Sequence, residues 1–176
     1  MSWRWLPNSP VDRARTRIVG SWRATTRLSL ALEWNPGEEE LLPNFNFSPS
    51  LPGEHIPGVG VITGTSSDRI GTPDGRAWFA SLSLSPQSMG WDIPVTGYVG
   101  ASYGTHANDL RAIGGLRWSL TDRLSAGILH DGEQIHGMAS YQLGSLPSGG
   151  PTWAVDLLLV EFDGSHTAGL TLSTRF

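Results

Sequence analysis

Alternation of apolar and polar residues along nearly the whole chain is the feature that most constrains its fold. Side chains in a β-strand point alternately to the two faces of a sheet. The segment 27–34 places three leucines and Trp34 on one face and Arg27, Ser29, Ala31 and Glu33 on the other. No segment of any length has the 3.6-residue spacing of an amphipathic helix. The sequence therefore predicts an all-β protein.

The same alternation recurs often enough to predict most of the strands. Strong candidates cover residues 15–24, 27–34, 76–85, 95–103, 110–120, 123–130, 135–143 and 153–161 and a final stretch ending at Phe176. Weaker candidates cover residues 2–6, 41–48 and 59–65. If the chain reverses direction at each connection, a strand pair is required between Asn35 and Thr65. We predict about ten to twelve strands in one domain that covers residues 1–176.

The charged residues within these segments lie almost entirely on the face opposite the leucines and tryptophans. In a β-sandwich the apolar face would be the interior, and the arginines would contact water. In a membrane barrel the apolar face contacts lipid, and the arginines line the interior. The alternation of apolar and polar residues would fit either architecture. A soluble carbohydrate-binding module with tryptophans on its ligand face is therefore an alternative to the barrel.

The C-terminal segment favours the barrel. Its alternation runs to the terminal Phe176, with Leu170 and Leu172 on the same face and Arg175 on the other. This ending resembles that of bacterial outer-membrane β-barrels, in which the last strand closes the barrel and its terminal aromatic residue belongs to the insertion signal. The resemblance implies a closed antiparallel transmembrane barrel in a Gram-negative outer membrane. It also implies short periplasmic turns, longer external loops, and outer-membrane lipid and the barrel-insertion machinery as partners.

Composition excludes several other classes of protein. The chain contains no run of about 18 apolar residues that could form a transmembrane helix, and no secretory signal is recognisable at its start. Cysteine is absent, which excludes disulfides and thiolate metal sites, and the net charge of -4 argues against a nucleic-acid partner. All twelve basic residues are arginine.

Eight tryptophans are many for 176 residues. In a barrel such residues form belts at the two membrane–water interfaces. Residues 22–29 and 118–125 also repeat one pattern, a tryptophan before a tight turn and then Arg-Leu-Ser, which predicts two similar hairpins. The predicted interface aromatics are Trp22, Trp34, Trp78, Trp118, Trp153 and Phe176.

The polar face of the strands carries the residues predicted to line the barrel interior. Charges that face a narrow lumen must be paired or hydrated, so one interpretation is a structural network of ion pairs and water. The alternative is a constriction lined by Arg111 and Arg117 that favours small anions. The predicted lumen-facing residues are Arg15, Arg17, Arg23, Glu33, Arg111, Arg117, His136 and Asp156.

The segment 64–75 is the most distinctive predicted loop, because its Gly, Ser, Thr, Asp and Pro residues all favour turns. With the strand that follows, it resembles the loop and aromatic strand of barrel proteins associated with exopolysaccharide export, which would imply a role in polysaccharide secretion. A self-packed external loop is the alternative. The predicted loop residues are Ser66, Ser67, Asp68, Arg69 and Asp74.

The sequence favours a structural or narrow-pore barrel, by itself or within a larger assembly. His130, Asp131, Glu133 and His136 could approach one another across neighbouring strands, but their spacing matches no zinc signature. No nucleophile motif of an outer-membrane lipid-modifying enzyme is recognisable either. We therefore expect no enzymatic activity, no cofactor and no metal, with a lipid-modifying enzyme as a further alternative.

Overall fold

The computed structural model describes residues 1–7, 15–37, 39–67, 75–105, 108–145, 151–162 and 165–175. It contains twelve strands and one short 3-10 helix, η1 (Pro86–Met89). The strands are β1 (Ser2–Trp5), β2 (Thr16–Arg23), β3 (Leu28–Asn35), β4 (Glu40–Ser50), β5 (Val59–Ser67), β6 (Arg76–Leu84), β7 (Val95–Gly104), β8 (Asp109–Ser119), β9 (Leu124–His130), β10 (Ile135–Ser145), β11 (Thr152–Phe162) and β12 (Ser165–Arg175).

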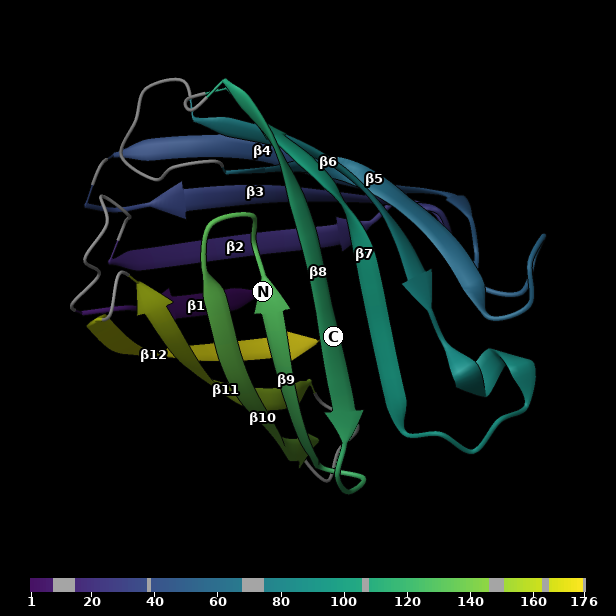
Figure 1. Cartoon of the computed structure of the whole chain (residues 1–176). Helices are drawn as coiled ribbons and strands as arrows, with labels where there is room; N and C mark the ends of the chain where they lie inside the picture. The colour runs from purple at the N-terminus through teal and green to yellow at the C-terminus, as the bar shows by residue number, and fades with distance from the viewer. Residues whose placement is uncertain are drawn as a thin grey trace.

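The twelve strands form one closed antiparallel barrel in which each strand pairs with its neighbours along the chain (Figure 1). The barrel closes where β1 pairs with β12, with Ser2 opposite Ser173 and Trp5 opposite Leu170. Closure gives both edges of the sheet a partner, which an open sheet does not achieve. The predicted closed barrel is confirmed, and its twelve strands are at the upper limit of the predicted ten to twelve. The alternative β-sandwich is not observed.

The weaker strand candidates are real strands. β4 and β5 form the strand pair that the direction of the chain requires between Asn35 and Thr65, and Asn46 lies opposite Gly64 across them. Among the residues that the structure describes, no helix has the length and apolar character needed to cross a membrane.

The two predicted similar hairpins share one turn geometry. The Oγ1 atom of Thr25 accepts hydrogen bonds from the backbone N–H groups of Arg27 and Leu28, at 3.1 and 2.9 Å. Thr121 Oγ1 accepts the equivalent bonds from Arg123 and Leu124, at 3.2 and 2.9 Å. A threonine hydroxyl that bonds to the backbone ahead of it is a local turn device, so the repeated sequence encodes a repeated structure.

The expected arrangement, with short connections at one end of the barrel and longer connections at the other, is not observed. At the end of the barrel that carries both termini, the turn 24–27 is short but the connections 51–58 and 85–94 are long. At the opposite end, the connections 36–39 and 131–134 are as short as that turn. Because the entropy cost of closing a loop grows slowly with its length, packing of each connection can set its length at either end.

Glycine allows two strands to approach closely near the middle of the sheet. A Cβ atom at Gly100 of β7 would lie 2.2 Å from the carbonyl oxygen of Ala80 and 2.7 Å from the Cα of Ser81, both in β6. Both obstacles are backbone atoms of the paired strand, so they cannot rotate away. Gly20 of β2, in contrast, has nothing within 4 Å of the same position.

Candidate functional site

The two faces of the barrel wall have inverted polarity relative to a water-soluble protein. Among the described residues, only Leu6, Ala77 and Val160 are buried hydrophobic residues. The buried polar residues are more numerous: Glu33, Asn35, Ser50, Thr65, Ser81, Ser125, Gln134, His136, Ser140 and Thr167. Apart from Ser50 and Thr65, which lie opposite the outward residues Val61 and Trp78, they lie on the inner side. Large apolar side chains are exposed on the outside along most strands, among them Leu32, Leu82, Leu116, Leu157 and Leu170. The candidate site is therefore the polar interior of the barrel.

The predicted interface aromatics lie on the outward face where the structure describes them. Trp22, Trp118 and Trp153 lie toward the end that carries the termini, and Trp34 and Trp78 lie toward the opposite end. Trp22 is 66% exposed, although it is one of the largest apolar side chains in the chain. These five tryptophans thus occupy two levels, and Phe176 lies outside the described residues.

We call the end with the connections 36–39, 105–108 and 131–134 the filled end. Here Arg17 of β2 lies 3.5 Å from the carboxylate of Glu33 on β3. The side-chain amide of Asn35 donates to the same carboxylate at 3.3 Å, and Asn35 is fully buried. The two predicted lumen residues Arg17 and Glu33 therefore form part of an inward ion-pair cluster.

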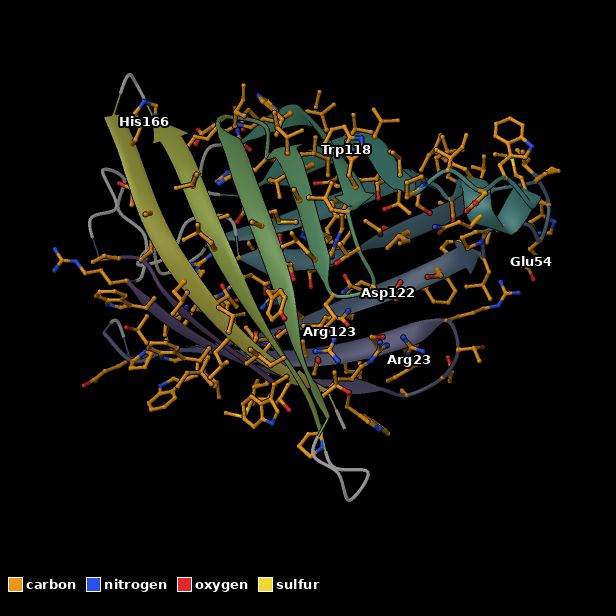
Figure 2. All side chains as sticks on the ribbon, turned by 90° about the horizontal axis from the view of Figure 1, so that it is seen from below. Arg23, Glu54, Trp118, Asp122, Arg123 and His166 are labelled. Carbon is orange, nitrogen blue, oxygen red and sulfur yellow. The ribbon has the colours of Figure 1, made fainter. Side chains whose placement is uncertain are left out.

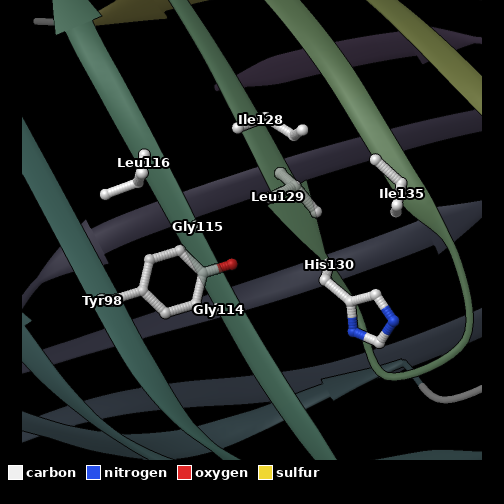
Figure 3. A pocket seen from close by; sticks show the side chains of 8 residues that line it. All are labelled: Tyr98, Gly114, Gly115, Leu116, Ile128, Leu129, His130 and Ile135. Carbon is white, nitrogen blue, oxygen red and sulfur yellow. The ribbon is translucent and has the colours of Figure 1, made fainter.

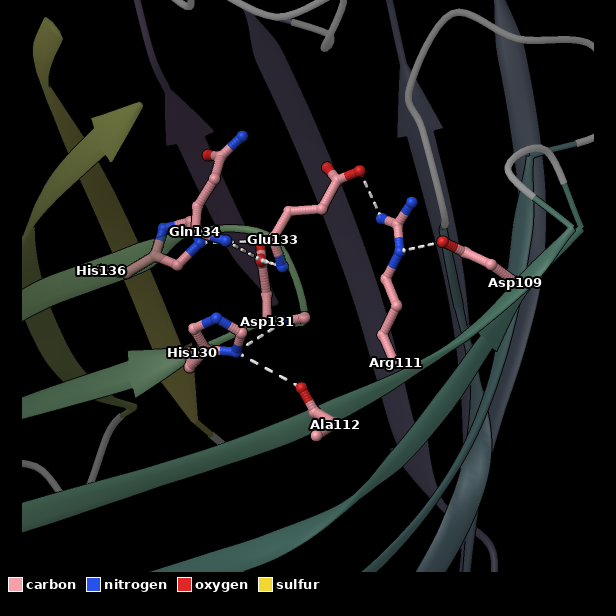
Figure 4. A network of polar contacts seen from close by, with 9 residues as sticks. Asp109, Arg111, Ala112, His130, Asp131, Glu133, Gln134 and His136 are labelled. Atoms are coloured by element: carbon pink, nitrogen blue, oxygen red, sulfur yellow. Dashed lines mark hydrogen bonds and ion pairs between the residues drawn. The ribbon is translucent and has the colours of Figure 1, made fainter. Parts of the chain in front are cut away.

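A second inward cluster centres on Arg111 of β8 (Figure 4). Its Nε atom donates to Oδ2 of Asp109 at 2.8 Å, and its Nη1 atom lies 2.5 Å from Oε1 of Glu133. Glu133 belongs to the connection between β9 and β10, and a Cβ atom at Gly132 would lie 2.6 Å from the Cβ of Arg111. The tip of this hairpin therefore packs directly on Arg111, which has two carboxylate partners.

His136 of β10 anchors the same hairpin tip. Its Nε2 atom lies 2.7 Å from Oδ2 of Asp131, and Oδ1 of Asp131 accepts bonds from the backbone N–H groups of Glu133 and Gln134. Gln134 is only 4% exposed. His130 lies outward, and its Nδ1 accepts a bond from the N–H of Gly132 at 3.1 Å. Asp131 and His136 thus do meet, as the sequence suggested, but as a pair that fixes a turn.

Apolar side chains also face the interior, although only charged residues and His136 were predicted there. Ile113 lies on the same face of β8 as Arg111, and Leu129 lies opposite His136. Met138 faces inward between β9 and β11, where it lies opposite Leu158. These residues were visible in the sequence as apolar members of the polar face. They narrow the interior between the filled end and the middle of the barrel.

We call the end that carries both termini the open end, because a cavity of about 570 Å³ lies there. Arg117 lies near this end, where its Nε and Nη2 atoms donate to Ser125 Oγ at 3.0 and 2.7 Å. Arg23 is exposed on the inward face of β2. The side chains that line the cavity are mainly small and polar: Ser2, Ser21, Gln142, Thr152, Ala154, Ser173, Thr174 and Arg175, together with Met1.

The predicted lumen residues therefore do not form one site. Arg111 belongs to the filled end and Arg117 to the open end, so the structure separates the two arginines of the proposed constriction. Arg111 has its own acidic partners, one of them two positions earlier on the same strand face. Asp156 faces inward about midway along β11, opposite Ser140 and Thr171. Arg15 is exposed just before β2, toward the filled end.

The predicted loop residues divide between a strand and undescribed chain. Ser66 and Ser67 are the last residues of β5, opposite Ala77 and Arg76 of β6, so they are strand residues and not loop residues. Pairing with β6 outweighs the local preference of serine for turns. Asp68, Arg69 and Asp74 lie outside the described residues.

A shallow cavity of about 300 Å³ lies in the wall formed by β7 to β10 (Figure 3). The ring of Tyr98 crosses the backbone of Gly115, where a Cβ atom would lie 2.7 Å from the ring. Gly114 and Gly115 leave the wall thin at this point, and Leu116 and Ile128 border it. An aromatic ring that covers a glycine on the neighbouring strand stabilises a sheet locally, so this feature has a structural explanation.

The connection 51–58 at the open end is fixed by Glu54. The N–H of Leu51 donates to Oε2 of Glu54 at 3.0 Å, and the other carboxylate oxygen pairs with Arg27, which also donates to the carbonyl of Pro49 at 2.7 Å. The hydrogen bond from Leu51, helped by the charge of Arg27, holds the pKa of the Glu54 carboxyl below its ordinary value.

Acidification is therefore expected to release this connection. Because the folded-state pKa of Glu54 is lowered, its stabilising effect is present above the ordinary glutamate pKa and is lost as the pH falls through the lowered value. The amide NMR signal of Leu51 should titrate at that pH in the parent protein and show no such step in Glu54→Gln. Asp122→Asn in the other turn should leave the step unchanged. A step that persists in Glu54→Gln would contradict the assignment.

The described residues contain no group of three or more His, Asp or Glu side chains placed to hold a metal ion. Compared with models of protein families, with curated proteins and with solved structures, the chain matches none of them. What the chain does must therefore be inferred from its barrel, which has an apolar exterior, a filled end and an open end.

Proposed function

We propose that this chain is a β-barrel of a bacterial outer membrane with a structural role, by itself or within a larger assembly. The observation that carries the proposal is the inverted polarity of the wall, with leucines and tryptophans exposed outside and charged and hydroxyl side chains inside. Soluble proteins rarely expose apolar surface on this scale. Lipid, in contrast, requires an apolar exterior and a sheet without open edges.

Two further features support the same proposal. Five strands (β4, β8, β10, β11 and β12) have eleven residues each, and about 9–11 residues are enough for a tilted strand to cross a bilayer. Five of the outward tryptophans, Trp22, Trp34, Trp78, Trp118 and Trp153, occupy two levels, as the aromatic belts of membrane barrels do. The partners would be outer-membrane lipid and the machinery that inserts barrels, and the proposal includes no enzymatic step.

The side chains that occupy the lumen favour a structural role over a pore for general diffusion. The ion pairs of Arg17 and Arg111, the hairpin tip at Asp131 and the inward apolar side chains occupy the lumen near the filled end. A narrow pore is the second candidate, since the open end has a cavity of about 570 Å³. Its selectivity would not come from Arg111, which is already paired with two carboxylates.

The first experiment compares gel mobility of the detergent-refolded protein with and without boiling. We expect a heat-dependent shift, together with a β-type circular dichroism spectrum, because a closed barrel resists the detergent until it is heated. A sample that is denatured before detergent is added should show no shift. A single mobility and a soluble monomer in plain buffer would contradict the proposal and make the tryptophans candidates for a sugar-binding face. Planar-bilayer recordings then separate the two roles, because a structural barrel gives no steady conductance and a pore does.

A further inference from the structure

Charge is separated along the axis of the barrel. Inward carboxylates of the described strands gather toward the filled end, at Glu33, Glu40 and Asp109, and the hairpin tip adds Asp131 and Glu133. Arg17 and Arg111, two of the inward arginines of this end, are each paired with a carboxylate there. The carboxylates of the filled end therefore neutralise these two arginines.

The open end has a different arrangement. Arg23 of β2, Arg117 of β8, Arg123 just before β9 and Arg175 of β12 all lie on the inward face, and in the described part of the chain none of them forms an ion pair. In Figure 2, which shows the barrel from below, Arg23 and Arg123 lie on different walls and both point toward the space between them. Like charges that share a confined space repel one another unless an anion joins them.

The cavity lies among these arginines. Its walls come from five neighbouring strands, β2, β1, β12, β11 and β10, and Arg175 is one of its lining residues. Arg23 lies two residues beyond the lining residue Ser21, on the same face. On the other side of the cavity, next to β10, lie Arg117 of β8 and Arg123 just before β9. The carbonyl of Arg123 accepts a hydrogen bond from the N–H of the lining residue Gln142. Hydroxyl and amide groups thus line a cavity that arginines border on both sides.

We propose that the open end of the lumen binds a small multivalent oxyanion, a molecule that carries several phosphate or carboxylate groups. Guanidinium groups bind both oxyanions through paired, charge-assisted hydrogen bonds. The hydroxyls of Ser2 and Ser21 can donate to the same oxygens. Asp156 lies deeper, beyond Ala154 on the same face of β11. Asp122 lies in the turn just before Arg123, so the four arginines of the open end outnumber the carboxylates beside them. The inference concerns the interior and does not depend on whether the outer face contacts lipid.

Calorimetric titration of the detergent-folded protein at low ionic strength tests this site. Tripolyphosphate represents the phosphate source and citrate the carboxylate source, and maltotriose serves as a neutral ligand of similar size. We expect at least one of the anions to bind, with an affinity that falls steeply as salt is added, and maltotriose not to bind. The stronger of the two anions identifies the source. Binding of neither anion at low salt, or binding of maltotriose as tight as theirs, would overturn the proposal.

Variants locate the binding within the barrel. Arg23→Gln combined with Arg117→Gln should weaken the affinity about tenfold or more, because one lost charge-assisted hydrogen bond is already worth that factor. Arg15→Gln removes an exposed arginine near the filled end and should leave the affinity unchanged. Equal loss in both variants would overturn the placement of the site. Circular dichroism and the heat-dependent mobility shift check that each variant is folded, so a failure to bind is separated from a failure to form the barrel.

Discussion

Replacing Leu157 by arginine is expected to make folding into phospholipid vesicles less favourable by about 2–4 kcal/mol, the cost that a cation near the bilayer midplane has on a lipid-exposed face. Leu157 lies in the middle of β11, is 45% exposed and lies opposite Leu170 on the outward face. On the surface of a soluble protein, a half-exposed leucine would tolerate arginine with little effect. The size of the loss therefore distinguishes lipid from water outside the barrel.

The matched control is Ala154→Arg in the same strand. Ala154 faces inward and lines the cavity of the open end, where the new cation can be hydrated and its repulsion from Arg175 is screened by salt. We expect a loss within about 1 kcal/mol for this variant. Urea-dependent unfolding from vesicles measures both variants. Equal stabilities of Leu157→Arg and Ala154→Arg would show that the outer face contacts water.

Gly100→Ala is expected to lower the free energy of unfolding by about 3 kcal/mol, the upper range for overpacking in a rigid site. The new methyl group would overlap the carbonyl oxygen of Ala80 and the Cα of Ser81. Relief requires β6 and β7 to move apart, and each of these strands is also paired on its other side. Urea-dependent loss of the heat-resistant form in detergent measures the effect.

Gly20→Ala serves as the control, because nothing lies within 4 Å of the Cβ position of Gly20 in β2. Its effect should stay within about 0.5 kcal/mol. Equal stability of the two variants would mean that the strands β6 and β7 adjust at little cost. It would also mean that the close approach at Gly100 does not constrain the sheet.

Most of the sheet could be predicted from the sequence because the alternation of each segment is local. The strand pair between Asn35 and Thr65 had only weak alternation, and the direction of the chain supported it; β4 and β5 confirm it. The turns at Thr25 and Thr121 could be inferred from a repeated motif, since both depend on hydroxyl bonds within a few residues. Both kinds of inference used interactions close in the sequence.

The division of the interior into two unlike ends could not be predicted in the same way. Arg111 and Arg117 lie on one face of one strand, and their difference depends on Glu133 of the next hairpin and on Ser125 of β9. The alternation shows on which face of the sheet a side chain lies, but not which residue of another strand or hairpin it contacts. The predicted separation of short and long connections failed for a similar reason, since 51–58 is long at the end that carries the termini and 131–134 is short at the opposite end.

The scarcity of buried hydrophobic residues has a consequence for how this chain can fold. With only Leu6, Ala77 and Val160 buried among the described apolar residues, the collapse of the chain on itself removes little apolar surface from water. The ordinary driving force of folding is therefore largely absent inside the molecule. It must be supplied by whatever covers the exposed leucines and tryptophans, so in plain water the ladder of backbone hydrogen bonds would have to hold the barrel almost unaided. We expect folding and the acquisition of an apolar environment to be one event for this chain.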